Sequence, residues 1–335
     1  MSKIRLLAVT ALAMALGTPA ANANDPFTIQ LKWVTQAQFA GYYVALEQGF
    51  YDEVGLDVTI QPGGPDIAPP QVIAAGGADV IIEWMPAALA ARERGVPLVN
   101  VAQFFNRSGM MLTCRADSGI TAPEDFAGHT LGVWFAGNEY PFLSWMSRLG
   151  FSTSGPDADV EVLRQGFNVD PLLQNQAACI STMIYNEYWQ VVDAGIPEDE
   201  LVTFFYEDQG VATLEDGLYA LESSLEDPEY VDKLARFIAA SARGWQYAIE
   251  HVDEAAQAIV DADMAGAATF EVQQRQMENI ATLITADAEH LGYLDPEAFQ
   301  RTVDVLLSGD SDPVISEDPG EAAWTHDVWD QAMGQ

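Results

Sequence analysis

Basic residues are scarce in this chain of 335 residues, and lysine is the scarcest of them. Lysine occurs only as Lys3, Lys32 and Lys233, and all lysines and arginines number 14 against 50 aspartates and glutamates, a formal net charge of −36. A surface of this sign repels nucleic acids and anionic membranes, which argues strongly against both as partners. The simplest interpretation of the negative net charge is a solvated acidic surface. Repulsion of anionic ligands from a cleft is a weaker alternative, because salt screens such electrostatic fields.

Cysteine is also rare, with only Cys114 and Cys179. The two form no CxxC pair and have no histidine nearby, so they do not make a metal motif. In an exported protein a disulfide is chemically possible, and two buried free thiols are an equal alternative, because sequence supplies no geometry. Beyond the first residues, no segment is long and apolar enough to be transmembrane.

Common catalytic signatures are missing as well. The four histidines, His129, His251, His290 and His326, are scattered, without HExxH or zinc spacing. The sequence contains no GxSxG, no P-loop and no GxGxxG. We therefore expect no metal site and interpret the histidines as ordinary surface or core residues.

The first 23 residues are typical of a cleavable signal peptide. Lys3 and Arg5 give a basic start, residues 6–17 form an apolar run too short to span a bilayer, and residues 21–23 fit a small-x-small cleavage site. No cysteine lies near that site, which disfavours a lipoprotein. Cleavage after Ala23 would leave a soluble exported protein, most simply a periplasmic one.

From residue 28 to about residue 204 the sequence alternates apolar runs with helical stretches. Nine strands are predicted, over residues 28–33, 56–60, 79–82, 98–104, 110–114, 130–135, 160–163, 179–184 and 201–204. Helices between most of them predict an α/β fold with mainly parallel sheets covered on both faces. Beyond Asp227 the chain is nearly all helical, with later helices predicted over residues 269–291 and 295–307.

Two stretches look like crossings between lobes, residues 105–109 going out and residues 214–224 returning. We therefore predict a discontinuous first lobe, residues 24–106 plus 224–335, and an inserted second lobe, residues 107–223. The cleft between them would hold the ligand, and hinge closure is the expected motion of what we take to be a monomer.

Aromatic and amide side chains crowd the first place where a strand gives way to a helix. Open α/β sheets bind ligands at such strand ends. Trp33 offers a stacking face there, and the alternative is that it fills the top of the core. Gln36 and Gln38 follow in a polar loop and are candidates to face the ligand, although one of them could instead be exposed to solvent. Tyr42 and Tyr43 point about 100° apart on the helix, so only one is expected to face the cleft.

Further candidates follow other predicted strands. Glu83 and Trp84 end one strand, and an ordinary solvated acid is the alternative for Glu83. In the second lobe Asn138, Glu139 and Tyr140 begin a helix, where we favour a capping role for the side chain of Asn138. Even then, backbone N–H groups beside it would face the cleft.

The strongest second-lobe candidates are Asn186, Glu187 and Tyr188, an amide, an acid and an aromatic ring at one strand end. The candidate loops thus offer carboxylates, amides and aromatic rings with few basic groups. A sulfonate or nitrate site would want arginine, lysine or several free N–H donors. Carboxylates suit ring N–H and amino groups, so a small planar nitrogen heterocycle is the better prediction.

Residues 31–58, LKWVTQAQFAGYYVALEQGFYDEVGLDV, resemble the opening of one branch of the type II periplasmic binding proteins. Shorter matches follow in order at residues 78–80, 94–97, 125–128 and 130–133. The branch includes binding proteins for thiamin pyrimidine precursors, riboflavin and aliphatic sulfonates, and the fungal thiamin pyrimidine synthase. The opening is more similar to the pyrimidine and riboflavin receptors than to the sulfonate ones.

The resemblance implies a two-lobed, Venus-flytrap receptor that delivers a solute to the permease of an ABC importer. The fungal synthase is the alternative, and it holds pyridoxal phosphate on a lysine beside a histidine and a cysteine-rich iron motif. Glu83 and Ala87 stand where that lysine and histidine are expected, and residues 210–217 contain no cysteine. Neither Lys32 nor Lys233 aligns with the lysine, so we expect a receptor without a cofactor rather than an enzyme.

Overall fold

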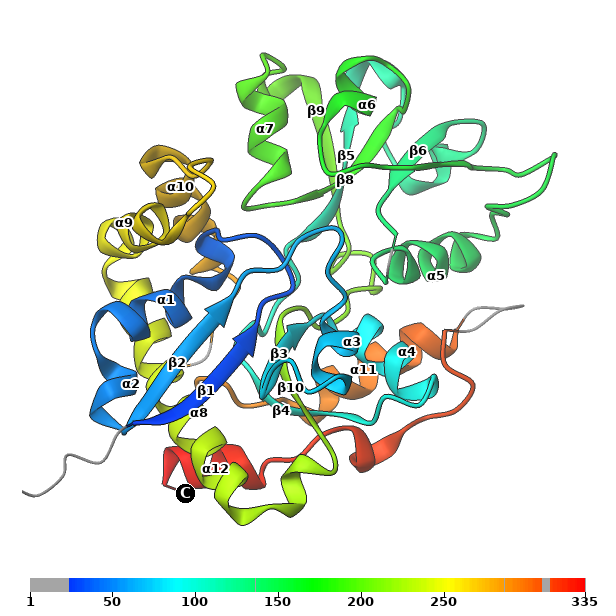
Figure 1. The fold of residues 1–335 in the computed structure, drawn as a ribbon. Coiled ribbons are helices and arrows are strands. Elements are labelled where there is room, and N and C mark those ends of the chain that lie inside the picture. The colour runs from blue at the N-terminus through cyan, green and yellow to red at the C-terminus, as the bar shows by residue number, and fades with distance from the viewer. Residues whose placement is uncertain (1–23, 136, 286, 309–313, 335) are drawn as a thin grey trace, which may run out of the picture.

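The computed structural model describes residues 24–135, 137–285, 287–308 and 314–334. The predicted signal peptide and its cleavage site therefore lie outside the described residues. Within them the chain forms two five-stranded sheets, each flanked by helices (Figure 1). No helix in these ranges has the length and hydrophobicity that a membrane span requires.

Ten strands and twelve α-helices cover the described part of the chain. The strands are β1 Asp25–Gln30, β2 Leu56–Gln61, β3 Val80–Glu83, β4 Leu98–Gln103, β5 Met110–Arg115, β6 Thr130–Val133, β7 Glu161–Arg164, β8 Cys179–Met183, β9 Leu201–Phe205 and β10 Gly217–Leu221. The helices are α1 Ala40–Glu47, α2 Phe50–Glu53, α3 Pro69–Ala74, α4 Met85–Glu93, α5 Glu139–Leu149, α6 Asp170–Leu173, α7 Glu187–Asp193, α8 Pro228–Glu250, α9 Val252–Ala262, α10 Phe270–Ile280, α11 Pro296–Leu307 and α12 Asp327–Met333.

The strand order is β2-β1-β3-β10-β4 in the first sheet and β7-β6-β8-β5-β9 in the second. Four strands of each sheet run in one direction. The exceptions are β10, which is antiparallel to β3 and β4, and β5, which is antiparallel to β8 and β9. The predicted α/β class with mostly parallel sheets is therefore confirmed, and all nine predicted strands occur within a few residues of their predicted ranges.

The tenth strand, β10, was not predicted, because its residues fall in the stretch interpreted as the return crossing. Gly217 pairs with Glu83 of β3 and Gln103 of β4, so β10 belongs to the first sheet. The chain leaves that sheet after β4, crosses to β5 and returns between β9 and β10. We accordingly place the return boundary before Gly217 rather than at residue 223, and each antiparallel strand directly follows a crossing.

The helical C-terminal part differs from the prediction in two places. Helix α9 follows α8 after a single residue, His251, and was not predicted. Helix α10 ends at Ile280, eleven residues before the predicted end of that helix. The carbonyl of Leu283 instead accepts hydrogen bonds from the backbone N–H groups of Asn106 at 3.0 Å and Arg107 at 3.2 Å. Tertiary bonds to the outward crossing thus take the place of further helical bonds.

The disulfide between Cys114 and Cys179 joins neighbouring strands of the second sheet. The two residues lie directly opposite each other in the antiparallel pairing of β5 and β8. The register of these strands therefore decides between the two alternatives that the sequence left open.

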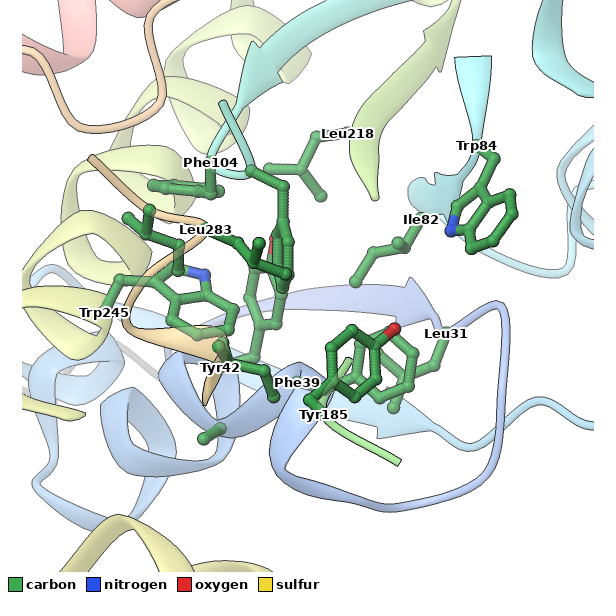
Figure 2. Packing of buried hydrophobic residues seen from close by; sticks show 14 of the residues in the cluster. Leu31, Phe39, Tyr42, Ile82, Trp84, Phe104, Tyr185, Leu218, Trp245 and Leu283 are labelled. Carbon is green, nitrogen blue, oxygen red and sulfur yellow. The ribbon is translucent and has the colours of Figure 1, made fainter. Parts of the chain in front are cut away.

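The core of the first lobe depends on a close approach of α1 and α8. A side chain at Gly244 would lie 2.1 Å from the carbonyl oxygen of Gly41, so only glycine fits there. The contact turns Tyr42 inward, where its ring lies parallel to that of Phe237 with centroids 6.2 Å apart and meets the ring of Trp245 edge-on (Figure 2). Tyr42 is therefore a core residue, contrary to its predicted role in ligand binding.

Candidate functional site

A cavity of about 420 Å³ lies between the two sheets and takes its lining from both. This volume is in the lower part of the range of roughly 300–1,000 Å³ for small-molecule sites. Nine of the thirteen predicted binding residues line it: Trp33, Gln36, Gln38, Glu83, Trp84, Asn138, Tyr140, Asn186 and Glu187. Their contact with a ligand is a prediction that the placement supports.

A lysine that sequence reasoning left out lies at the centre of the first-lobe wall. The pairing of β1 with β3 matches Gln30 with Ile81, so the residues two positions further on, Lys32 and Glu83, lie side by side. The ammonium Nζ of Lys32 is 2.9 Å from Oε1 of Glu83 and 4.9 Å from the ring centroid of Trp84. The view that the site has few basic groups therefore needs a correction, because an ion pair lines the cavity here.

The two glutamines of the loop before α1 form one hydrogen-bonded unit. Nε2 of Gln36 donates to Oε1 of Gln38 at 2.6 Å, and Nε2 of Gln38 donates to Oδ2 of Asp216 at 2.6 Å. Their exposed fractions are 7% and 4%, so neither is a solvent-exposed loop residue. The loop is held in place by Gln273, whose side-chain oxygen accepts from the backbone N–H of Ala37 at 2.7 Å.

The loop between β6 and α5 supplies part of the second-lobe wall. Asn138 occupies the N-cap position of α5, but its side chain makes no capping hydrogen bond, so the capping role that we favoured is wrong. Glu139 turns its carboxylate back to the N–H of Gly137 at 2.7 Å and is not among the lining residues. Burial raises the pKa of Glu139 above its usual value.

Another part of the second-lobe wall comes from the segment between β8 and α7. Oε2 of Glu187 accepts from the N–H of Met183 at 3.0 Å, and its Oε1 accepts from Nδ2 of Asn186 at 2.8 Å. Burial raises the pKa of Glu187 to about 7. Tyr185, between Met183 and Asn186 in the sequence, is fully buried and lines the cavity. It belongs to the same hydrophobic cluster as Leu31 of the first lobe (Figure 2).

Three other predicted residues do not reach the cavity. The hydroxyl of Tyr43 shares a hydrogen bond of 2.9 Å with the hydroxyl of Thr35, and Tyr43 is not part of the lining. We expected one of the two tyrosines of α1 to face the cleft, but neither lines the cavity. The hydroxyl of Tyr188 donates to Glu198 at 2.8 Å on the outside of α7. Glu139, described above, is the third. Each of these side chains is held by a hydrogen bond to another residue, which the sequence pattern alone did not reveal.

The lobes also touch at the mouth of the cavity and outside it. The rings of Trp33 and Phe167, one from each lobe, have centroids 4.6 Å apart, although Phe167 is still 55% exposed. Arg275 of α10 pairs with Asp193 of α7, and the side-chain oxygen Oδ1 of Asn186 accepts from Nε2 of Gln276 at 2.9 Å. These contacts hold the two halves together around the cavity.

The chemistry of the lining combines aromatic faces with a mixed set of charges. Rings come from both lobes, including Trp33, Trp84 and Phe135. Besides the ion pair of Lys32 and Glu83, the charged lining residues are Asp66, Arg94 and Glu187, the first two at exposed positions of the rim. Among the described residues no group of three or more histidines, cysteines or acids could hold a metal ion. The cavity thus suits a flat molecule with both hydrogen-bond donors and acceptors.

Comparisons with known proteins agree with this description. The family described as NMT1/THI5 like matches residues 36–255. The chain is 26% identical over 339 aligned positions, 93% of it and 95% of the relative, to a formylaminopyrimidine-binding protein of Halalkalibacterium halodurans. It is 25% identical to a riboflavin-binding protein of Chloroflexus aurantiacus, over 89% of this chain and 85% of that one.

Two further comparisons concern fungal enzymes and solved structures. A shorter match, 24% identical over 46% of this chain and 43% of the relative, is to a 4-amino-5-hydroxymethyl-2-methylpyrimidine phosphate synthase of Schizosaccharomyces pombe. The crystal structure of the periplasmic aliphatic sulphonate binding protein of Escherichia coli superimposes with a TM-score of 0.64 at 13% identity, covering 90% of this chain and 92% of that one. This likeness confirms the periplasmic-binding-protein fold.

Proposed function

The chain belongs to the NMT1/THI5-like family, and from that premise we propose that it is the solute-binding protein of an ABC importer for a small planar nitrogen heterocycle. The compartment is the periplasm, reached by the predicted signal peptide. The observation that carries the proposal is the cavity between the sheets, with aromatic rings on both walls and the pair of Lys32 and Glu83 between them.

The ion pair favours a particular kind of ligand edge. Lys32 can only donate hydrogen bonds, and the ionised carboxylate of Glu83 can only accept them. Aminopyrimidines and flavins carry an acceptor next to a donor, a ring nitrogen beside an amino group or a carbonyl beside an N–H, and such an edge complements both groups. A sulfonate or nitrate carries acceptors alone, so it would satisfy Lys32 and leave Glu83 facing an anion. The charge arrangement therefore favours the heterocycle over the anion.

The enzyme alternative requires pyridoxal phosphate, and the cavity does not fit that cofactor. Lys32 lines the cavity although it does not align with the cofactor-binding lysine of the synthase, but its ammonium is bound to Glu83 at 2.9 Å. Apart from Lys32, the only basic residue of the lining is Arg94 on the exposed rim, whereas Asp66, Glu83 and Glu187 would face the phosphate. Phosphate sites are normally built from arginine, lysine or convergent N–H groups. We propose a receptor on this ground.

A ligand screen by thermal shift and calorimetry tests the proposal. The compounds are 4-amino-5-hydroxymethyl-2-methylpyrimidine, its formylamino counterpart and riboflavin, with taurine and nitrate as the anionic alternative. A ligand at 100 times its Kd should stabilise the protein by about 2.7 kcal/mol. Trp84→Ala should weaken binding, and Tyr188→Phe, outside the cavity, should leave it unchanged. A response to taurine or nitrate alone would refute the heterocycle.

A further inference from the structure

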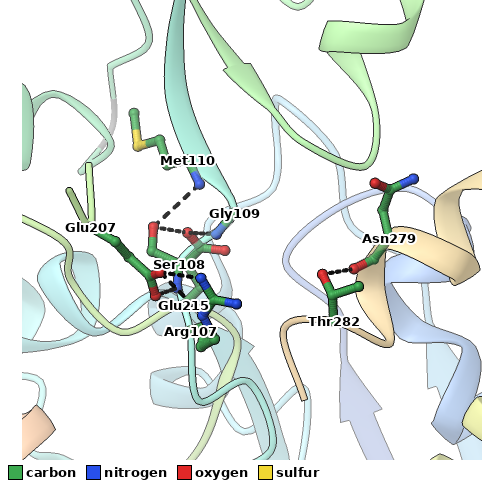
Figure 3. A network of polar contacts seen from close by, with 8 residues as sticks. All are labelled: Arg107, Ser108, Gly109, Met110, Glu207, Glu215, Asn279 and Thr282. Atoms are coloured by element: carbon green, nitrogen blue, oxygen red, sulfur yellow. Dashed lines mark hydrogen bonds and ion pairs between the residues drawn. The ribbon is translucent and has the colours of Figure 1, made fainter. Parts of the chain in front are cut away.

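The two crossings between the lobes are tied to each other by carboxylates of the return crossing. Oε1 of Glu215, just before β10, accepts from the hydroxyl of Ser108 at 2.6 Å and from the N–H of Gly109 at 3.0 Å. Glu207 accepts from the N–H of Ser108 at 3.0 Å and pairs with Arg107 at 2.7 Å (Figure 3). The outward and return segments are therefore bound together where the lobes must rotate about each other.

The neighbouring acid, Asp216, is bound to the cavity instead. Its Oδ2 accepts from Gln38, which in turn accepts from Gln36, each at 2.6 Å, and both glutamines line the cavity. Asp216 has a φ of +29°, in the left-handed region that non-glycine residues rarely occupy. Such backbone strain persists only where the surroundings fix it, and it gathers at switch and binding regions. Adjacent carboxylates thus have separate partners, one at the crossing and one at the cavity.

Both acids are deeply buried, with exposed fractions of 1% for Glu215 and 2% for Asp216. Oε2 of Glu215 and Oδ1 of Asp216 have no hydrogen-bond partner among the described residues. Burial raises the pKa of Glu215 to about 8 and that of Asp216 to about 6. A buried acid with an unpaired oxygen is unfavourable, so the pair is sensitive to small changes at either end.

The ionisable groups around this pair come from both lobes. Lys32 and Glu83 act on Asp216 from the ends of β1 and β3, with opposite effects on its pKa. Burial raises the pKa of Tyr185 of the second lobe, and the charges of Asp216 and Glu215 raise it further. Tyr42 and Tyr219 of the first lobe have pKa values raised by burial, and the charge of Asp216 raises both further. The pair therefore has charged or ionisable neighbours on the cavity wall as well as in the core.

We infer that the hydrogen bonds from Gln36 to Gln38 and from Gln38 to Asp216, continued through the peptide bond to Glu215, couple occupation of the cavity to the hinge formed by the two crossings. Asp216 acts in this path as a positioning residue. The inference rests on the proposed function, because its first two members line the ligand cavity. A ligand that binds either amide changes the hydrogen bond that Asp216 receives, and Asp216 is covalently continuous with the acid that joins the two crossings. Coupling between sites is reciprocal, so a change at the hinge must alter the cavity loop and its affinity.

Hydrogen exchange tests this chain without a ligand. Ser108→Ala removes one of the two hydrogen bonds to Oε1 of Glu215 and lies outside the cavity lining. We expect amide exchange in residues 36–39 to accelerate by about threefold or more relative to residues 161–164 of β7. Ser108→Thr keeps the hydroxyl and should restore the wild-type rate, and Asp208→Asn, exposed on the same crossing, should have no effect. Unchanged exchange in residues 36–39 for Ser108→Ala would overturn the inference.

Calorimetry with riboflavin and with 4-amino-5-hydroxymethyl-2-methylpyrimidine gives the second test. For the compound that binds, we expect Asp216→Asn to raise Kd by about tenfold, as the loss of one buried charged hydrogen bond predicts. Ser108→Ala should raise Kd by about threefold through the coupling, whereas Asp208→Asn should not change it. If the wild type binds neither compound, the proposed function fails and hydrogen exchange still decides the inference. If the wild type binds a compound and both Asp216→Asn and Ser108→Ala bind it with the wild-type Kd, the inference fails and the proposed function stands.

Discussion

At the scale of single residues, the pair of Lys32 and Glu83 decides the character of the cavity. Oε1 of Glu83 accepts from Lys32 and from the backbone N–H of Trp84, each at 2.9 Å. The side chains of Lys32 and Glu83 are only 15% and 6% exposed. A pair buried to this extent is strongly destabilised when one partner is removed, because the remaining charge loses its compensation. Each group is therefore expected to contribute to ligand binding and to compensate the charge of the other.

Removing either charge should weaken binding of a heterocycle. Glu83→Gln keeps the shape of the side chain but leaves Lys32 unpaired, and Lys32→Met leaves Glu83 unpaired. We expect each change to raise the Kd of the bound heterocycle by about tenfold, measured by calorimetry at pH 7. Lys233→Met is the matched control, because the ammonium of Lys233 is 3.6 Å from Glu229 on the surface of α8. Tighter heterocycle binding by Glu83→Gln would contradict the donor-and-acceptor edge.

At the scale of elements, helix α7 begins with an acid that is buried rather than solvated. Glu187 is 8% exposed, and burial raises its pKa from 4.5 to about 7. At the other end of the same helix, the hydrogen bond from Arg275 lowers the pKa of Asp193. The two ends of α7 therefore respond to pH in opposite directions, and only the buried end titrates near neutrality.

This difference predicts a pH dependence of stability. Because the pKa of Glu187 is higher in the folded than in the unfolded protein, its favourable contribution is complete below pH 4.5 and is lost as the pH rises through about 7. The shift corresponds to about 3 kcal/mol between these limits. We expect the Tm to fall between pH 5 and pH 8, and we expect Glu187→Gln to reduce that slope in thermal denaturation.

Asp193→Asn supplies the control for the pH prediction. The lowered pKa of Asp193 keeps it ionised throughout the range from pH 5 to pH 8. The substitution should therefore shift the Tm without changing its slope in this range. An unchanged slope in Glu187→Gln would show that the buried acid does not titrate in the folded protein as proposed.

The sequence pattern was more informative about strands than about helix ends. Apolar runs revealed nine strands, because a buried parallel strand is apolar on both faces. Helix α10 was predicted too long, since hydrogen bonds from the outward crossing to the carbonyl of Leu283 end the helical region early. The faces of α1 were also misjudged, because the contact of Gly41 with Gly244 rotates Tyr42 toward α8. Such errors come from contacts between distant segments, which a local pattern does not contain.

At the scale of the whole molecule, the excess of acids acts against compactness. The formal charge of −36 has few counter-charges, and the ion pairs of the described residues are mostly at the surface, where each contributes little. Repulsion among like charges destabilises a compact protein.

Salt should therefore stabilise this protein. The Debye length falls from about 30 Å at 0.01 M to about 3 Å at 1 M ionic strength, which screens the repulsion between acids. We expect the Tm to rise by about 5 °C or more over this range, measured by differential scanning calorimetry in sodium chloride at constant pH. Sucrose at matched osmolality separates screening from general exclusion of solute. A flat or falling Tm would show that the surface charge is not a destabilising term.

The sequence by itself determined the fold class, the sign of the surface and nine of the residues that line the cavity. Composition is independent of conformation, and side chains at the ends of parallel strands meet at one edge of a sheet whatever the details of packing. Only the tertiary structure decided that Lys32 lies beside Glu83, because this depends on the register of β1 and β3. Likewise, the hydrogen bond from Gln38 to Asp216 joins residues 178 positions apart, and it forms only because the end of the return crossing packs against the loop before α1.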